Sequence, residues 1–99
     1  MVELDELGLL EMSELFQCFA DPTRLKIIQV LLGGEQCVGD LTGLLGMSQP
    51  AVSHHLRLLR QLRLVKTSRS GKKVVYSLAD EHIRQLFDTC REHVAERAR

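Results

Sequence analysis

The segment Gly46-Met47-Ser48 joins two amphipathic stretches and constrains the fold of this 99-residue chain more than any other feature. Apolar residues recur at helical spacing over 38–45 and again over about 48–61. Ser48 is a good N-cap for the second stretch, and Pro50 suits its first turn. Two helices joined by about three residues that include glycine predict a helix-turn-helix. The side chains of the first helix expected to point inward are Val38, Leu41, Leu44 and Leu45.

Helical spacing also predicts helices on both sides of this motif. We expect one within residues 4–19, one over 22–32 that begins at Asp21-Pro22 and ends at Gly33-Gly34, and a last one over about 80–97. The apolar stripe of the last helix consists of Ile83, Leu86, Phe87, Cys90 and Val94.

A β-hairpin is predicted between the helix-turn-helix and the last helix. Residues 65–68 and 73–78 flank the turn residues Ser70-Gly71, and Val74, Tyr76 and Leu78 alternate with Lys73, Val75 and Ser77. The fold class is therefore mainly α with a small β-hairpin. We expect a single winged helix-turn-helix domain over residues 1–99, with the wing over about 65–78.

Charge is unevenly distributed along the chain, although its net value is zero. Residues 1–40 carry eight acids and two bases, whereas residues 41–79 carry no acid and seven bases. A long stretch of one sign indicates a face that binds a polyanion. The alternative is chance segregation on a solvated surface. The seven bases are Arg57, Arg60, Arg63, Lys66, Arg69, Lys72 and Lys73.

The predicted second helix of the motif has one apolar face and one polar face without a carboxylate. Amide, hydroxyl, imidazole and guanidinium groups can contact base edges and phosphates in a DNA major groove, and a basic wing can contact the backbone beside it. His55 falls on the apolar face, where a hydrogen-bonded packing role is expected. The DNA-contact candidates are Ser48, Gln49, Ser53, His54 and Arg57 on the helix, with Arg69, Lys72 and Lys73 in the wing.

Four motifs in this order resemble the ArsR/SmtB family of small, dimeric bacterial winged-helix repressors. They are DPTR at 21–24, EQCVGDL at 35–41, SQPAVSHHL at 48–56 and GKKVVYSL at 71–78. The resemblance covers nearly the whole chain from about Leu15 onward. It implies a homodimer that reads a palindromic operator and represses a promoter until an inducer binds.

The cysteines argue against a thiolate site for the inducer. Arsenic- and lead-type family members carry Cys-Val-Cys where this chain has Cys37-Val38-Gly39, and one soft ligand holds such ions poorly. Cys18 and Cys90 are expected in the core, and Cys37 is expected to be a small packing residue or a helix-start residue. Three widely spaced cysteines, an acidic N-terminus and the lack of a long apolar run indicate a reduced, cytoplasmic protein without a secretory signal or transmembrane helix.

Asp80-x-His82 and His93-x-x-Glu96 resemble the family's last-helix zinc site. Eleven residues make about three turns plus 20°, so His82 and His93 share one side of the helix but lie about 16 Å apart. Because zinc–nitrogen bonds are about 2 Å long, one chain cannot close the site. Two antiparallel last helices would form two equivalent sites, each with Asp80 and His82 of one chain and His93 and Glu96 of the other. The alternative is that Asp80 is only an N-cap and the others are surface residues.

The ligand set of two imidazoles and two carboxylates suits Zn(II), with Co(II) as a stand-in. The sequence therefore predicts a metal-responsive repressor whose metal-free dimer binds operator DNA and whose zinc-bound form releases it. Alternatives are the same fold with a non-metal or redox inducer, and a zinc-binding dimerisation module that does not bind DNA. An enzyme with a small-molecule substrate is not expected, because the chain has no nucleophile–base constellation and no phosphate loop. No membrane partner is expected.

Overall fold

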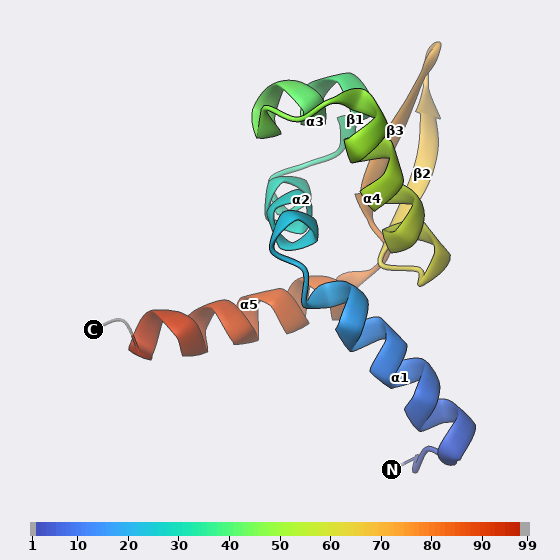
Figure 1. Ribbon diagram of the computed structural model, residues 1–99, viewed down its shortest axis with the longest axis vertical. Helices are drawn as coiled ribbons and strands as arrows, with labels where there is room; N and C mark the ends of the chain where they lie inside the picture. The colour runs from blue at the N-terminus through green and yellow to red at the C-terminus, as the bar shows by residue number, and fades with distance from the viewer. Residues whose placement is uncertain (1, 98–99) are drawn as a thin grey trace.

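The computed structural model describes residues 2–97 and confirms the predicted winged helix-turn-helix (Figure 1). Helices α3 and α4 form the helix-turn-helix, strands β2 and β3 form the wing, and α5 follows the wing directly. In chain order the elements are α1 (Glu6–Phe19), α2 (Pro22–Leu32), β1 (Gln36–Cys37), α3 (Val38–Leu45), α4 (Gln49–Gln61), β2 (Val65–Ser70), β3 (Lys73–Leu78) and α5 (Glu81–Arg97).

Short polar side chains cap the N-termini of α1, α2 and α4. Asp5 caps α1, Asp21 caps α2 and Ser48 caps α4, each accepting a hydrogen bond from the backbone N–H three residues later, at 2.8, 2.9 and 3.3 Å. Each cap satisfies a donor that the helix itself leaves unpaired. The caps at Asp21 and Ser48 were predicted from the sequence, and the cap at Asp5 was not.

A residue in the left-handed region follows the end of helix α4. Arg63 has φ 59°, its N–H donates to the Arg60 carbonyl at 3.0 Å, and the Leu64 N–H donates to the Leu59 carbonyl at 2.9 Å. This is the Schellman arrangement, in which glycine is the usual residue. It turns the chain sharply from α4 into the wing.

The sheet has three antiparallel strands in the order β1-β3-β2. Strand β1 pairs with β3 through Gln36 opposite Tyr76 and Cys37 opposite Val75. The sequence did not predict β1, because two residues are too few to show an alternating pattern. This strand ties the connection between α2 and α3 to the middle of β3.

The core lies where α2, α3, α4, the base of the wing and the start of α5 meet. The expected inward position of Leu44 was wrong. Leu44 is 62% exposed, because it lies to the side of the inward pair Leu41 and Leu45 on α3. On β3, Val75 takes the buried face and its neighbour Val74 is exposed. The side chains with almost no exposed surface are Ile27, Ile28, Leu41, Val52, Leu56, Leu59 and Leu64.

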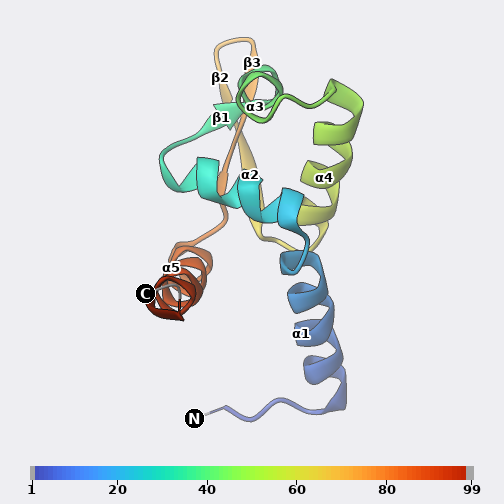
Figure 2. The same ribbon diagram turned by 60° about the vertical axis from the view of Figure 1, so that its left-hand side comes forward.

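Helices α1 and α5 leave the body of the molecule in different directions (Figure 2). Ile83 and Phe87 of α5 are buried, but the same apolar stripe continues to Cys90, which is exposed, and to Val94, which is 63% exposed. The expected core position of Cys90 is therefore wrong, because the stripe extends past the body of the chain that would cover it. Helix α1 exposes a comparable apolar set: Leu7, Leu9, Leu10, Met12 and Phe16.

Candidate nucleic-acid interface and metal site

The outward face of α4 is polar and free along its length. Gln49, Ser53, His54 and Arg57 are exposed, while Val52, Leu56 and Leu59 on the opposite face are buried. The Arg57 Nη2 atom lies 3.4 Å from Nδ1 of His54, so these two side chains lie together on the exposed surface. The hydroxyl of Ser48 accepts the Ala51 N–H, so this candidate contact is also the helix cap.

The basic candidates of the wing gather at its tip. Arg69, Lys72 and Lys73 are exposed and surround the turn at Gly71, whose φ is 65°. Helices α3 and α4 and the wing occupy the same end of the molecule, and α1 and α5 leave from the other (Figures 1 and 2). The polar face of α4 and the basic wing tip can therefore act on one polyanion.

The sequence did not predict that Asp40 lies near the basic wing. Hydrogen bonds from the thiol and amide of Cys37 hold the pKa of the Asp40 carboxyl below its ordinary value, and the positive charge of Lys73 in the wing lowers it further. A carboxylate thus lies near a basic residue of the wing, although residues 41–79 contain none. Only the packing of α3 against β3 could reveal this proximity.

The predicted packing role of His55 is confirmed. Its ring is partly buried, and Nδ1 lies 3.4 Å from the Arg24 Nη1 atom of α2. His54, one residue earlier, is exposed as predicted.

Asp80 and His82 lie together at the start of α5. Oδ1 of Asp80 accepts the backbone N–H groups of His82 at 2.9 Å and Ile83 at 3.3 Å, and it lies 3.5 Å from Nδ1 of His82. Asp80 is therefore an N-cap, as the alternative interpretation states. Capping uses one carboxylate oxygen, and the side chain of His82 is 88% exposed, so an imidazole and a carboxylate oxygen remain accessible to a metal ion.

His93 and Glu96 lie one turn apart on the exposed second half of α5. Within residues 2–97, no group of three or more His, Cys, Asp or Glu side chains is close enough to hold a metal ion. The single chain therefore presents two separated donor pairs rather than a closed site. The donor chemistry suits zinc, and each pair fits one half of a four-ligand site.

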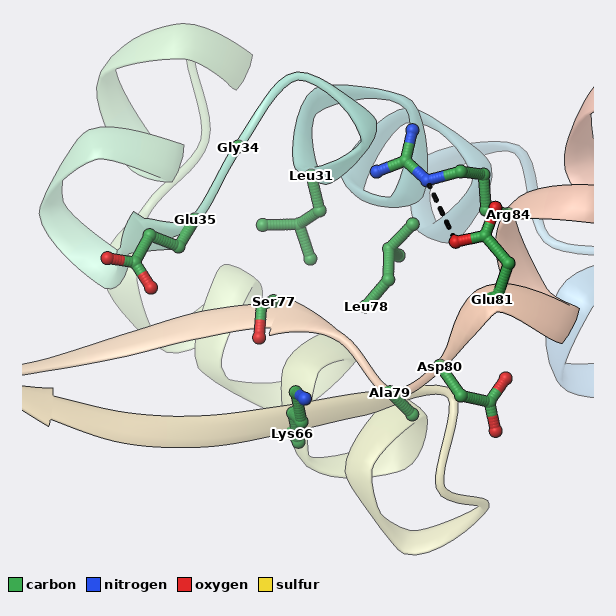
Figure 3. A pocket seen from close by; sticks show the side chains of 10 residues that line it. All are labelled: Leu31, Gly34, Glu35, Lys66, Ser77, Leu78, Ala79, Asp80, Glu81 and Arg84. Carbon is green, nitrogen blue, oxygen red and sulfur yellow. Dashed lines mark ion pairs between the residues drawn. The ribbon is translucent and has the colours of Figure 1, made fainter.

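A polar pocket of about 360 Å³ lies between the end of α2, the strands and the start of α5 (Figure 3). Asp80 and Glu81 lie at one end and Glu35 at the other, so the carboxylates do not gather into a second acidic site. Arg84 donates to the Leu32 carbonyl at 3.2 Å and pairs with Glu81 at 3.8 Å. The first contact fixes the start of α5 to the end of α2, and the second lies within α5.

Comparison with known proteins agrees with this architecture. The model of the bacterial regulatory protein, arsR family, matches residues 21–67. A transcriptional repressor SmtB homolog from Synechocystis sp. is 45% identical over 87% of this chain and 65% of its own length, just under two thirds. A cadmium resistance transcriptional regulatory protein, a CadC homolog from Staphylococcus aureus, is 42% identical over 88% of this chain and 73% of its own length.

A solved structure supports the same conclusion. The homodimeric winged helix-turn-helix DNA-binding domain of a possible ArsR-family regulator from Mycobacterium bovis has a TM-score of 0.85 and 26% identity, covering 97% of this chain and 92% of that one.

The fold is that of a winged-helix transcriptional regulator, and the relatives that match this chain are transcriptional regulators. The chain belongs to the ArsR family. The predicted class, a transcriptional repressor of this family, is confirmed at the level of the family. No helix within residues 2–97 is long and apolar enough to cross a membrane.

Proposed function

We propose that this chain is a cytoplasmic, homodimeric repressor that binds a palindromic operator when metal-free and releases it when Zn(II) binds between its two α5 helices. The observation that carries the proposal is the arrangement of donors on α5. Asp80 with His82 and His93 with Glu96 form two accessible pairs about 16 Å apart along one helix. Such pairs can complete a zinc site only when a second chain supplies the missing half.

Two exposed apolar surfaces support a dimer. One is the face of α1 that carries Leu10 and Phe16. The other is a hollow of about 380 Å³ between α2 and the second half of α5, where Phe19, Phe87 and Val94 are among the lining residues. A second copy that covered these surfaces would form an isologous interface, with each α5 beside its counterpart. The similar domain from Mycobacterium bovis is a homodimer.

Each residue of the proposed zinc site has its own role. Asp80 is held by its own helix cap and supplies a carboxylate oxygen next to His82. His93 and Glu96 of the second copy supply the other imidazole and carboxylate. Zinc, when bound, supplies a link between the protomers that neither chain can make alone.

The start of α5 connects this site to the DNA-binding face. Helix α5 follows β3 of the wing with only Ala79 and Asp80 between them, and Arg84 ties it to the carbonyl of Leu32 at the end of α2. A fixed arrangement of the two α5 helices therefore restricts how the two wings and α4 helices are spaced. Zinc and operator then bind with negative coupling, which requires that operator also weakens zinc binding.

The test is a zinc titration of protein bound to a duplex that the wild-type chain selects from a randomised library. Wild type, His93→Ala and Asp88→Asn are compared by fluorescence anisotropy. Asp88→Asn is the matched control, because it removes a carboxylate from another side of α5, where Asp88 pairs with Arg91 at 2.9 Å. Zinc should release DNA from wild type and Asp88→Asn but not from His93→Ala.

Other outcomes identify the rival functions. If wild type stays bound to DNA in the presence of zinc, the inducer is not zinc. That result would favour the alternative of a non-metal or redox inducer. If His93→Ala releases DNA as wild type does, the α5 residues are not the sensor. Absence of salt-dependent binding to any duplex would instead favour a dimerisation module that does not bind DNA.

A further inference from the structure

Arg24 joins three helices of the molecule. Its Nε atom donates to the carbonyl of Cys18 in the last turn of α1 at 2.8 Å, and its Nη1 atom lies 3.4 Å from Nδ1 of His55 on α4. Its own backbone N–H donates to the cap residue Asp21 at 2.9 Å, which fixes the start of α2 beneath the guanidinium. The end of α1 and the inner side of α4 are thus held by one side chain.

The chemistry of the guanidinium suits this position. Carbonyls in the last turn of a helix lack intrahelical partners, and a positive charge there is favourable. A planar group with several donors can satisfy that carbonyl and a ring nitrogen together, which a lysine ammonium does less well. For His55 to accept this hydrogen bond, Nδ1 must carry no proton.

The contact continues outward from His55 to the surface of α4. The rings of His54 and His55 lie edge to face, with centroids 5.7 Å apart and planes at 62°. Nδ1 of His54 lies 3.4 Å from the guanidinium of Arg57. A continuous series of contacts therefore runs from the end of α1 through Arg24 and His55 to two exposed residues of the DNA-facing surface.

We propose that Arg24 and His55 are positioning residues for operator recognition. Their hydrogen bond sets α4 relative to α1, and His55 in turn supports His54 and Arg57 in the conformation that meets DNA. This inference rests on the proposed function, since it assumes that α4 reads the operator. It adds a role for two partly buried residues that are not among the predicted DNA contacts.

The test compares His55→Gln with His55→Leu in full-length, metal-free protein. Glutamine keeps an acceptor for Arg24, whereas leucine of similar size does not. Affinity is measured for the duplex selected by wild type and for a scrambled duplex, and the free energy of unfolding is measured in urea. Arg24→Gln and the double variant Arg24→Gln/His55→Leu complete a cycle. Lys26→Gln removes the same charge from an exposed position of α2 and serves as the control.

His55→Leu and Arg24→Gln should each weaken binding to the selected duplex about tenfold and the scrambled duplex by less than about twofold, and the double variant should lose little more than either single variant. His55→Gln and Lys26→Gln should stay within about twofold of wild type on the selected duplex.

The proposal is wrong if His55→Leu binds the selected duplex as tightly as wild type. It is also wrong if His55→Gln binds that duplex as weakly as His55→Leu does, or if the losses of binding free energy in the two single variants add up in the double variant. A change in unfolding free energy without a change in affinity would show a purely structural role and also overturn it. If wild type itself does not prefer the selected duplex, the proposed function fails together with this inference, and that failure is recognised without any variant.

Discussion

Nδ1 of His82 lies 3.5 Å from Oδ1 of Asp80, the same oxygen that accepts the backbone N–H of His82. Asp80 therefore caps α5, and together with His82 it also offers two side chains of the kind that bind metal ions. Since the cap orients the carboxylate before any ion arrives, half of the proposed site is preorganised in each protomer. The other half, His93 and Glu96, lies about 16 Å further along the same helix.

Replacing Gln49 by Ala should weaken binding to the selected duplex by about 1–3 kcal/mol and leave binding to scrambled DNA nearly unchanged, because an exposed amide at the start of α4 can read a base edge. Gln85→Ala, at an exposed position of α5, is the control. Anisotropy titrations on both duplexes measure the difference. An equal loss on the two duplexes would remove Gln49 from the base-reading residues.

Replacing Lys72 by Ala in the wing should weaken binding to all duplexes alike. The slope of log affinity against log salt should fall in magnitude by about one, since one phosphate contact is lost. Lys26→Ala, on α2, should leave the slope as it is. If the Lys72 variant also keeps the wild-type slope, the wing tip does not contact phosphate.

Asp21→Ala should lower the free energy of unfolding at neutral pH by about 1 kcal/mol, because α2 loses its N-cap. The backbone N–H of Arg24 is the main cause that lowers the pKa of the Asp21 carboxyl. A carboxyl with a lowered pKa stabilises the fold above the ordinary Asp pKa of about 3.9, and this contribution disappears as the pH falls through the folded-state pKa.

The difference in unfolding free energy between wild type and Asp21→Ala should therefore become smaller as the pH is lowered. Urea unfolding at several pH values measures it. Asp21→Asn keeps a hydrogen-bond acceptor at the cap but has no titrating group there. The difference in unfolding free energy between Asp21→Asn and Asp21→Ala should therefore not depend on pH over this range. If wild type is still more stable than Asp21→Ala below about pH 2, the ionised carboxylate is not the source of that stability.

Cys90 and Cys18 should differ sharply in their reaction with iodoacetamide. Cys18 is 6% exposed and burial raises the pKa of its thiol, so it should react slowly at every protein concentration. Cys90 is exposed in the protomer but lines the apolar hollow beside α5. It should react fast in dilute protein and slow down as dimers form. A Cys90 rate that stays constant while sedimentation shows dimerisation would place α5 outside the dimer interface.

Local signals were sufficient to predict most of the fold. Asp21-Pro22 and Ser48 cap helices as expected, and α2 and α3 keep their predicted bounds because cap residues and glycines mark both ends. The outward face of α4 followed from helical periodicity alone. The donor pairs of α5 could also be placed from spacing, because both lie on one regular helix.

The parts that were missed depend on contacts between distant segments. Strand β1 exists only because β3 pairs with it. Arg24 and His55 are 31 residues apart, and neither carries a local sign of the other. The exposure of Cys90 was missed because an apolar stripe looks the same whether its own chain or a second chain covers it.

The central claim is that two chains share each metal site, and subunit exchange tests it most directly. His82→Ala and His93→Ala proteins are mixed, exchange is confirmed by mass spectrometry, and Co(II) absorption in the tetrahedral range is recorded. Each mutant homodimer lacks one ligand in both sites, so its absorption should be weak or altered. A heterodimer has one complete site and one site without either histidine, so its absorption should recover to about half of the wild-type value. Absorption that stays at the homodimer level after confirmed exchange would contradict the shared site.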